Sequence, residues 1–181
     1  MNKNINIRPV RPEDAEKHIR LGNLVWRDAY KDIFPEEVFI QKESRLQDMM
    51  KTFSQFVYNG GDRIGYVAEV DGELVGFISG KLSANYEHFK KQNYAELMAI
   101  YILPEYQGKG LGSTFKNLFL DWARKNNVKK FVIGVLKDNH KARKVYEKWG
   151  GQLDKYTQPF VRLGVEYDEV FYTYDLSKQE H

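Results

Sequence analysis

Cysteine is absent from the 181-residue sequence. Its absence excludes thiol nucleophiles, CxxC redox motifs and cysteine-based zinc sites, and it fits a reducing compartment. Long apolar runs are absent too, because the longest uncharged one, Leu97–Leu103, is far shorter than the ~20 residues that a membrane helix needs. The first ten residues lack the apolar core of a signal peptide. We therefore expect a soluble, cytoplasmic protein with no membrane partner.

The excess of positive charge is small, at +3 for pH 7. It is too small to indicate a nucleic-acid partner, although it is unevenly distributed. Residues 1–90 hold 13 basic and 14 acidic side chains, a net charge of −1, whereas residues 91–181 hold 15 and 11, a net charge of +4. A small anion is therefore expected to bind in the C-terminal half.

Signals for two other kinds of site are missing or scattered. The histidines show no metal-ligand spacing; they are His18, His88, His140 and His181. The G-x-S-x-G elbow of a serine hydrolase does not occur in the sequence. We expect neither a metal site nor a hydrolase triad.

The composition that is present is typical of a globular protein, with 42% hydrophobic and 29% charged residues. At ~150 residues per domain, the length favours one domain spanning residues 1–181. No internal repeat, low-complexity tract or linker divides the sequence.

Hydrophobic periodicity predicts the element order β-α-α-β-β-β-α-β-α-β-β. Strands are expected at 5–7, 64–70, 74–82, 95–103, 131–136 and 166–176, with one more between the last two, and helices at 12–33, from about 36 to 53, at 111–126 and at 140–149. Asp71-Gly72 is a strong hairpin signal, whereas Gly22 is expected to weaken the first helix. The polar segment Ser83–Asn93 is expected to form a loop. Two strand–helix–strand passages predict an α/β (α+β) fold whose mixed sheet carries helices on both faces.

The most informative segment is Leu103–Ser113, between a predicted strand and a predicted helix. Its three alternate glycines, Gly108, Gly110 and Gly112, let the backbone adopt positive φ and pass close to a ligand. The helix start presents unpaired N–H groups, and Lys109 adds positive charge. The segment predicts a phosphate-binding turn, and the alternative is a tight structural turn without a ligand.

Two common phosphate motifs do not fit this segment. A P-loop requires G-x-x-x-x-G-K-[ST], which the sequence lacks. The dinucleotide fingerprint G-x-G-x-x-G requires a glycine where Ser113 stands. It also requires an acidic residue at the end of the next strand, and the candidate, Asp138, lies about ten residues too far along the sequence. What remains is Q-x-x-G-x-G at Gln107–Gly112.

The sequence resembles the GNAT superfamily of acetyl-CoA-dependent N-acetyltransferases. The resemblance rests on A-E-L-M-A-I-Y-I-L-P-E-Y-Q-G-K-G-L-G at Ala95–Gly112 and on N-H-K-A-R-K-V-Y-E-K-W-G at Asn139–Gly150. The segment W-R-D-A-Y-K-D-I-F-P at Trp26–Pro35 looks like one bacterial branch. The resemblance implies the GNAT fold, with about seven mostly antiparallel strands, of which the fourth and fifth splay apart.

The resemblance further implies that acetyl-CoA is the co-substrate and that its pyrophosphate binds backbone amides of the glycine turn. The matching positions are Gln107, Gly108, Lys109, Gly110, Leu111 and Gly112, and the hydroxyl of Ser113 adds a contact. Main-chain groups of Ile100 and Ile102 are expected to pair with the pantetheine arm. The side chain of Asn139 is expected to contact the same arm.

Two residues match the catalytic positions of the family. Tyr146 is expected to protonate the departing thiolate, which needs modest help because thiol pKa values lie near ~8.5; otherwise it is a core tyrosine. Glu96 is expected to accept a proton from the amine through water, since an amine of pKa ~10 is mostly protonated at pH 7; otherwise it is solvated and no single base exists. A backbone N–H around residues 100–102 is expected to stabilise the oxyanion.

The acceptor amine is expected to bind beside the first helices and the last strands. Trp26, Tyr30, Tyr101 and the Tyr167–Tyr174 segment match this region, although most aromatic residues are expected to lie in the core. A basic cluster consists of Lys137, Lys141, Arg143, Lys144 and Lys148. It fits either a coenzyme 3′-phosphate or a solvated helix face.

Two glycines depart from the family pattern. Gly134 stands inside the fifth strand, where it is expected to enlarge the space beside the coenzyme or to form a bulge. Gly151 stands where the family usually has an aromatic residue, so one core contact is expected to be lost.

The predicted activity is transfer of an acetyl group from acetyl-CoA to a primary amine of a small molecule. Direct attack in a ternary complex is expected, because no cysteine is available for an acyl-enzyme. The alternatives are another acyl-CoA, a protein amine as acceptor, or a non-catalytic acetyl-CoA-binding module. Exposed strands near the C-terminus are compatible with a homodimer.

Overall fold

The computed structural model describes residues 4–58 and 60–178. These residues form two compact units that interleave along the chain. The first unit holds the described residues up to Gly80 together with Ala99–Asp121, and the second holds Lys81–Met98 and the described residues from Trp122 onward. The chain passes from one unit to the other within two strands and within one helix, so neither unit is a continuous segment of sequence.

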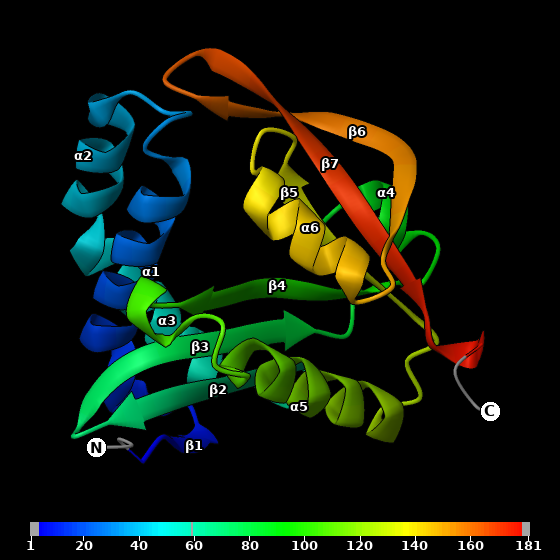
Figure 1. Cartoon of the computed structure of the whole chain (residues 1–181), viewed down its shortest axis with the longest axis horizontal. Helices are drawn as coiled ribbons and strands as arrows, with labels where there is room; N and C mark the ends of the chain where they lie inside the picture. The colour runs from blue at the N-terminus through cyan, green and yellow to red at the C-terminus, as the bar shows by residue number, and fades with distance from the viewer. Residues whose placement is uncertain (1–3, 59, 179–181) are drawn as a thin grey trace. The chain divides into compact units, whose positions relative to one another are not determined.

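The order of elements agrees with the predicted one except for two additional helices, α3 and α4 (Figure 1). The strands are β1 (Asn6–Pro9), β2 (Arg63–Val70), β3 (Glu73–Lys81), β4 (Ala95–Ile102), β5 (Lys130–Leu136), β6 (Gln152–Arg162) and β7 (Val165–Asp175). The helices are α1 (Ala15–Tyr30), α2 (Glu36–Ser44), α3 (Leu46–Tyr58), α4 (Glu87–Lys90), α5 (Leu111–Lys125) and α6 (His140–Lys148). Short 3-10 turns occur at Pro12–Asp14, Gly60–Asp62, Pro104–Tyr106 and Leu176–Lys178. Among the described residues no helix is both long and apolar enough to span a membrane.

The seven strands form one mixed sheet in the order β1-β2-β3-β4-β5-β7-β6. The pairs β1–β2, β5–β7 and β6–β7 are antiparallel, and β4–β5 is parallel. The β4–β5 ladder consists of two pairs, Ala95 with Phe131 and Glu96 with Val132, although both strands continue beyond them. A ladder this short is what splayed strands produce, and the predicted fold class is confirmed.

Two predictions about local structure are wrong. The helix expected from about Glu36 is divided at Arg45, whose backbone leaves the helical region at φ −91° and ψ 12°. The hydroxyl of Ser44 bonds to the carbonyl of Gln41 at 2.8 Å, a local contact of the kind that competes with helix continuation. The expected loop at 83–93 contains α4, which forms because Phe89 becomes fully buried.

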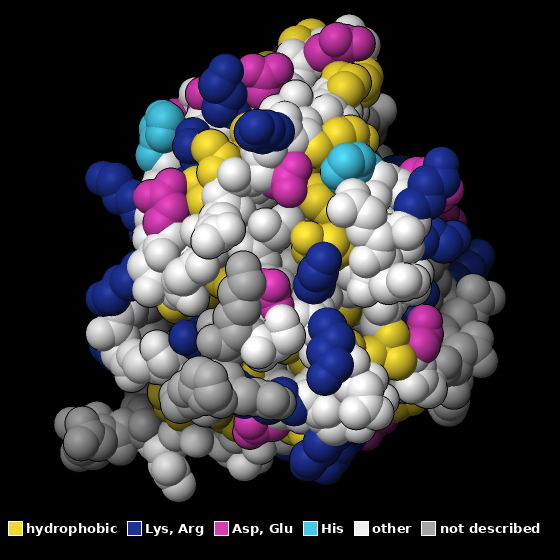
Figure 2. Space-filling model, turned by 90° about the vertical axis from the view of Figure 1, so that its right-hand side faces the viewer, with side chains coloured by type: hydrophobic (Ala, Val, Ile, Leu, Met, Phe, Trp, Pro, Cys, Tyr) yellow, Lys and Arg dark blue, Asp and Glu magenta, His cyan; other side chains and the backbone are white. Residues whose placement is uncertain are grey.

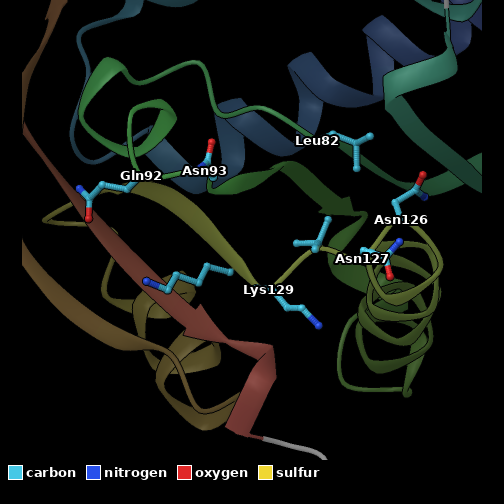
Figure 3. Close-up of a pocket in the computed structure, with 8 residues that line it drawn as sticks. Leu82, Gln92, Asn93, Asn126, Asn127 and Lys129 are labelled. Atoms are coloured by element: carbon cyan, nitrogen blue, oxygen red, sulfur yellow. The ribbon is translucent and has the colours of Figure 1, made fainter.

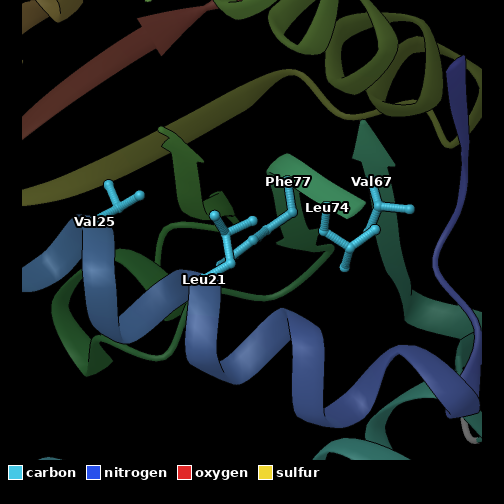
Figure 4. Packing of buried hydrophobic residues seen from close by; sticks show 5 residues of the cluster. All are labelled: Leu21, Val25, Val67, Leu74 and Phe77. Carbon is cyan, nitrogen blue, oxygen red and sulfur yellow. The ribbon is translucent and has the colours of Figure 1, made fainter. Parts of the chain in front are cut away.

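The first unit carries helices on both faces of its strands. Leu21 and Val25 of α1 form one buried cluster with Phe77 and its neighbours on β2 and β3, and in Figure 4 Leu21 lies against Phe77. The adjacent residue Gly76 points the other way, because a Cβ on it would lie 3.2 Å from the ring of Phe115 on α5. The predicted two-sided covering of the sheet is therefore present in this unit.

The second unit repeats this arrangement around β7. Phe171 packs against Phe89 of α4, with ring centroids 5.0 Å apart. The next residue, Tyr172, points to the opposite face and bonds through its hydroxyl to side chains of α6. Alternation along β7 thus separates an α4 face from an α6 face.

Candidate active site

The predicted site residues are distributed over both units. Those in the first unit are Trp26, Tyr30, Ile100, Tyr101, Ile102 and the glycine turn Gln107–Ser113. Those in the second unit are Glu96, Asn139 and Tyr146. The geometry of each group is described within its own unit.

The glycine turn adopts the backbone conformation that the sequence predicts. Gly108 has φ 71° and Gly110 has φ 89°, so both are in the left-handed region that favours glycine. A Cβ on either residue would meet no atom within 4 Å, which means that the turn is open on this side. Gly112 lies inside the first turn of α5.

The N-terminus of α5 follows this turn directly. The N–H of Thr114 donates to the carbonyl of Gly110 at 3.0 Å and makes the first bond of the helix. The N–H groups of Leu111, Gly112 and Ser113 therefore precede the helical ladder. Together with the partial positive charge of the helix end, such N–H groups bind phosphate.

Two side chains support the turn from within. The amide nitrogen of Gln107 donates to the carbonyl of Ile102 at 2.7 Å, so the turn is tied to the end of β4. This carbonyl is one of the main-chain groups that were expected to pair with the pantetheine arm. The ammonium of Lys109 lies 5.6 Å from the centroid of the Tyr106 ring.

Three predicted acceptor contacts lie among other aromatic rings. Trp26 is 8% exposed, and its ring stacks on Phe34 with centroids 5.0 Å apart. Tyr30 packs beside Trp26 at 5.1 Å, and Tyr101 meets Phe77 edge-on at 5.2 Å. Packing is therefore one role of all three, and contact with an acceptor stays a prediction.

In the second unit, Asn139 begins α6. Its side-chain oxygen accepts a hydrogen bond from the N–H of Ala142 at 3.1 Å, which caps the helix. The cap uses the oxygen only, so the amide nitrogen is the group suited to contact a ligand. Tyr146 lies in the last turn of the same helix, and its ring meets those of Trp149 and Tyr172.

The basic cluster around α6 is partly engaged within the protein. Lys137 bonds to Asp168 at 2.9 Å, and this contact raises the pKa of the lysine. Arg143 donates to the hydroxyl of Tyr172 and to the carbonyl of Lys137. On the face that Figure 2 shows, Lys and Arg side chains are interspersed with acidic ones. The remaining members of the cluster, Lys141, Lys144 and Lys148, are exposed.

Glu96 is buried on β4, with 5% of its surface exposed. The N–H of Asn85 donates to its carboxylate at 2.7 Å. Burial raises the pKa of Glu96, and the hydrogen bonds from Asn85 oppose this rise only in part. A carboxylate with a raised pKa is a better proton acceptor near neutral pH, as the predicted role requires.

A second buried carboxylate, Glu169 on β7, lies within the Tyr167–Tyr174 segment that was expected beside the acceptor, but it was not singled out as a site residue. It is 7% exposed and accepts hydrogen bonds from the hydroxyl of Tyr86 at 3.0 Å and from the amide of Gln158 at 2.9 Å. Within residues 4–58 and 60–178 it forms no ion pair. The signal that points to it is a charged residue directly before the apolar run that starts at Val170.

The space beside Gly134 is filled. A Cβ there would lie 2.5 Å from the hydroxyl of Tyr86 and 2.9 Å from the carboxylate of Glu169. The β5–β7 register runs through Gly134 without a shift, so no bulge forms. The expectation of extra room or a bulge at Gly134 is therefore wrong, and the glycine accommodates Tyr86 instead.

Glu96 and Tyr146 are on opposite faces of the second unit. Glu96 pairs with Val132 of β5, which packs with Phe171 and Phe89 on the α4 face. Tyr146 belongs to α6, which bonds to Tyr172 on the other face. The roles of Glu96 as proton acceptor and of Tyr146 as proton donor stay predictions.

A pocket in the second unit has a different lining (Figure 3). Its residues are Leu82, Gln92, Asn93, Asn126, Asn127, Val128, Lys129 and Lys130. None of the predicted site residues is among them, and no carboxylate or histidine lines it. It therefore offers no acid–base pair for group transfer.

The model of the family described as "Acetyltransferase (GNAT) family" matches residues 23–151, which include the glycine turn, Glu96 and Tyr146. The chain belongs to the acetyltransferase (GNAT) family. The match covers more than half of the sequence and both motifs on which the resemblance rests.

Curated and solved relatives agree with this GNAT assignment. Spermidine N(1)-acetyltransferase of Escherichia coli K12 is 29% identical over 147 residues, which are 81% of this chain and 72% of the relative. The PaiA N-acetyltransferase of Thermoplasma acidophilum, solved in complex with coenzyme A, has a TM-score of 0.73 at 24% identity and covers 94% of this chain and 99% of its own. YncA of Salmonella typhimurium, described as a putative acetyltransferase with its cofactor acetyl-CoA, has a TM-score of 0.67 at 20% identity, with 96% and 94% covered. The structural matches show the GNAT fold, and the family match makes the protein an N-acetyltransferase.

Proposed function

We propose that this GNAT enzyme transfers the acetyl group of acetyl-CoA to a primary amine of a small molecule, by direct attack in a ternary complex. The observation that carries the proposal is the open glycine turn at the start of α5, with Gly108 and Gly110 at positive φ. An N-terminus of this kind suits the pyrophosphate of a coenzyme. The coenzyme complexes of PaiA and YncA, which share the fold, support the same choice.

In the proposed complex the coenzyme contacts the positions that match the coenzyme site of the family. The backbone N–H groups of 107–112 and the hydroxyl of Ser113 bind the pyrophosphate. Main-chain groups of Ile100 and Ile102 and the amide nitrogen of Asn139 bind the pantetheine arm. Lys141, Lys144 and Lys148, which are exposed, are available to the 3′-phosphate.

The reaction starts from an ammonium, so two protons leave the nitrogen, one before attack and one as the tetrahedral intermediate collapses, while one proton reaches the thiolate. The second nitrogen proton replaces, through solvent, the proton that Tyr146 donates. Acetyl-CoA supplies a thioester carbon that the amine attacks, so that the C–N bond forms and the C–S bond breaks. Glu96 takes the ammonium proton through water, helped by the raised pKa that burial gives its carboxylate. A backbone N–H of 100–102 stabilises the oxyanion, and Tyr146 protonates the sulfur of the leaving coenzyme.

The proposed acceptor is a small cationic amine. Two buried carboxylates, Glu96 and Glu169, form no ion pair within residues 4–58 and 60–178, and buried carboxylates favour a cationic partner. The relative from Escherichia coli K12 is named for the polyamine spermidine, which supports an amine of this class.

Steady-state assays with a panel of amines test the proposal. The purified protein is mixed with acetyl-CoA and with spermidine, a simple monoamine or a lysine peptide, and release of the free thiol is followed. We expect thiol release that depends on the amine and is fastest with the small polyamine, with one N-acetylated product per thiol. Thiol release only with the peptide would contradict the small-molecule acceptor. If none of the amines in a broad panel caused thiol release, the transferase proposal would be contradicted.

A further inference from the structure

Tyr174 of β7 contacts the backbone of the proposed proton donor. Its hydroxyl donates a hydrogen bond to the carbonyl oxygen of Tyr146, 2.9 Å away. The same carbonyl accepts a bond from the N–H of Gly151 at 3.0 Å. The last turn of α6 would otherwise leave this carbonyl with fewer partners, and β7 supplies one from outside the helix.

Gly151 provides the space for this contact. A Cβ on Gly151 would lie 2.7 Å from the hydroxyl of Tyr174 and 2.9 Å from the carbonyl oxygen of Tyr146. Any larger residue in this backbone conformation would displace the hydroxyl. The core contact expected to be lost at Gly151 is therefore replaced by the Tyr174 side chain.

Tyr174 is itself held firmly. It is 4% exposed, and its ring stacks on Phe131 of β5 with centroids 4.2 Å apart and planes 3° from parallel. Burial raises the pKa of Tyr174, so its hydroxyl remains protonated and able to donate throughout the neutral pH range. A buried, stacked donor of this kind fixes the height of α6 over the sheet.

The ring of Tyr146 is contacted by a second tyrosine of the same strand. Tyr172 meets it edge-on, with centroids 6.0 Å apart. The hydroxyl of Tyr172 accepts a bond from Arg143 at 3.1 Å and donates one to Glu147 at 2.5 Å, both on α6. The carbonyl and the ring of Tyr146 are thus both contacted from β7.

We propose that Tyr174 is a positioning residue, which fixes the phenol of Tyr146 for proton transfer. Its hydroxyl occupies the space that Gly151 leaves open and from there holds the carbonyl of Tyr146. The inference rests on the proposed function, in which Tyr146 protonates the leaving thiolate. Proton donors act over short distances, so a small shift of α6 lowers the rate of transfer without removing the coenzyme site.

The first test is Tyr174→Phe, which removes the hydroxyl and keeps the stacked ring. We expect kcat to fall about three- to tenfold, because one hydrogen bond is lost, while KM for acetyl-CoA stays within about twofold. Tyr94→Phe is the control, since it removes the hydroxyl of a half-buried tyrosine of the same unit that has no contact with α6 among those described. The control should keep the kcat of the parent.

A double-mutant cycle separates positioning from a merely structural role. In the Tyr146→Phe background, Tyr174→Phe should lower the melting temperature as it does alone but leave kcat unchanged. An equal fall of kcat in both backgrounds, or a rise of KM for acetyl-CoA without a fall of kcat, would overturn the positioning role.

Gly151→Ala provides a second route if Tyr174→Phe does not fold. Its methyl group displaces the Tyr174 hydroxyl, and we expect the same loss of kcat with KM for acetyl-CoA preserved. Parental kcat in this variant, together with a large loss in Tyr146→Phe, would overturn the positioning role alone. Parental kcat in Tyr146→Phe would overturn the proposed role of Tyr146, and the positioning role with it.

Discussion

Glu96 of β4 and Glu169 of β7 are buried on the same face of the second unit, and within residues 4–58 and 60–178 neither forms an ion pair. Glu96 pairs with Val132, and the carboxylate of Glu169 lies 2.9 Å from where a Cβ of Gly134 would be. Val132 and Gly134 are two residues apart on β5, which separates the positions by about 7 Å along the strand. Two buried carboxylates at this spacing suit an acceptor with more than one cationic nitrogen.

Glu169→Gln tests this arrangement. The substitution removes the charge but keeps a side chain of similar size beside Tyr86 and Gln158. We expect KM for a polyamine to rise about tenfold or more, because a charged contact is lost, with little change for a monoamine or for acetyl-CoA. Glu166→Gln, an exposed change on the same strand, is the control. Equal effects on polyamine and monoamine would contradict a role for Glu169 in recognising a second cation.

Glu96 predicts the acid side of the pH profile. Burial raises its pKa, so the carboxylate becomes protonated, and inactive as a base, at a higher pH than an ordinary glutamate. As the pH is lowered, activity with a saturating amine should therefore begin to fall at a higher pH than it would if the base were an exposed glutamate. Glu96→Gln should remove this acid limb and lower kcat by about 10²-fold or more. A profile unchanged in shape by Glu96→Gln would show that another group takes the proton.

Gly110→Glu tests the phosphate site. The new side chain brings a negative charge to the start of α5, and the positive φ of 89° strains any residue other than glycine. We expect coenzyme binding to be abolished, whereas the backbone strain costs about 1–2 kcal/mol of stability. Gly164→Glu is a matched control, since Gly164 has φ 78° and is equally open, but lies in the β6–β7 turn. Titration calorimetry should give parental coenzyme affinity for the control and none for Gly110→Glu; binding by Gly110→Glu would contradict the site.

His18 predicts a loss of stability in mild acid. Its ring stacks on Phe77 at 3.7 Å, and burial lowers its pKa from 6.5 to about 4, against the opposing charge of Asp14. As the pH falls from 6.5 to 4, the unfolded chain takes up a proton that the folded protein excludes, so the free energy of unfolding decreases, by at most about 3 kcal/mol.

The measurement for His18 is the melting temperature between pH 7 and pH 4. His18→Phe should flatten the curve in this range relative to the parent, whereas the exposed His140→Gln should not. The same slope in His18→Phe and the parent would show that other groups cause the loss.

The features that could be predicted from the sequence depend on local signals. The Asp71-Gly72 turn has both residues at positive φ, 53° and 81°, as its residue types indicate. The glycine turn before α5 likewise follows from glycine chemistry and from the position of a strand and a helix around it. Local backbone preferences suffice for such features, because each is decided within a few residues.

The features that were missed depend on contacts between distant segments. α4 forms because Phe89 is buried against Phe171, which is 82 positions further along the chain. The hydroxyl of Tyr174 fills the space at Gly151, and that of Tyr86 fills the space at Gly134. No periodicity or motif indicates that two such residues meet, so Gly134 was expected to leave extra space and Gly151 to lose a core contact.

The most direct test of the central claim is a thermal-shift comparison of acetyl-CoA, free coenzyme A, NADH and ATP. A ligand at 100 times its dissociation constant adds about 2.7 kcal/mol of stability, which for a protein of this size is roughly 5–10 °C. We predict such a shift with acetyl-CoA and coenzyme A and none with the other two. A shift with NADH instead, or the absence of a shift with all four ligands, would contradict the assignment of the Gln107–Gly112 turn to coenzyme A.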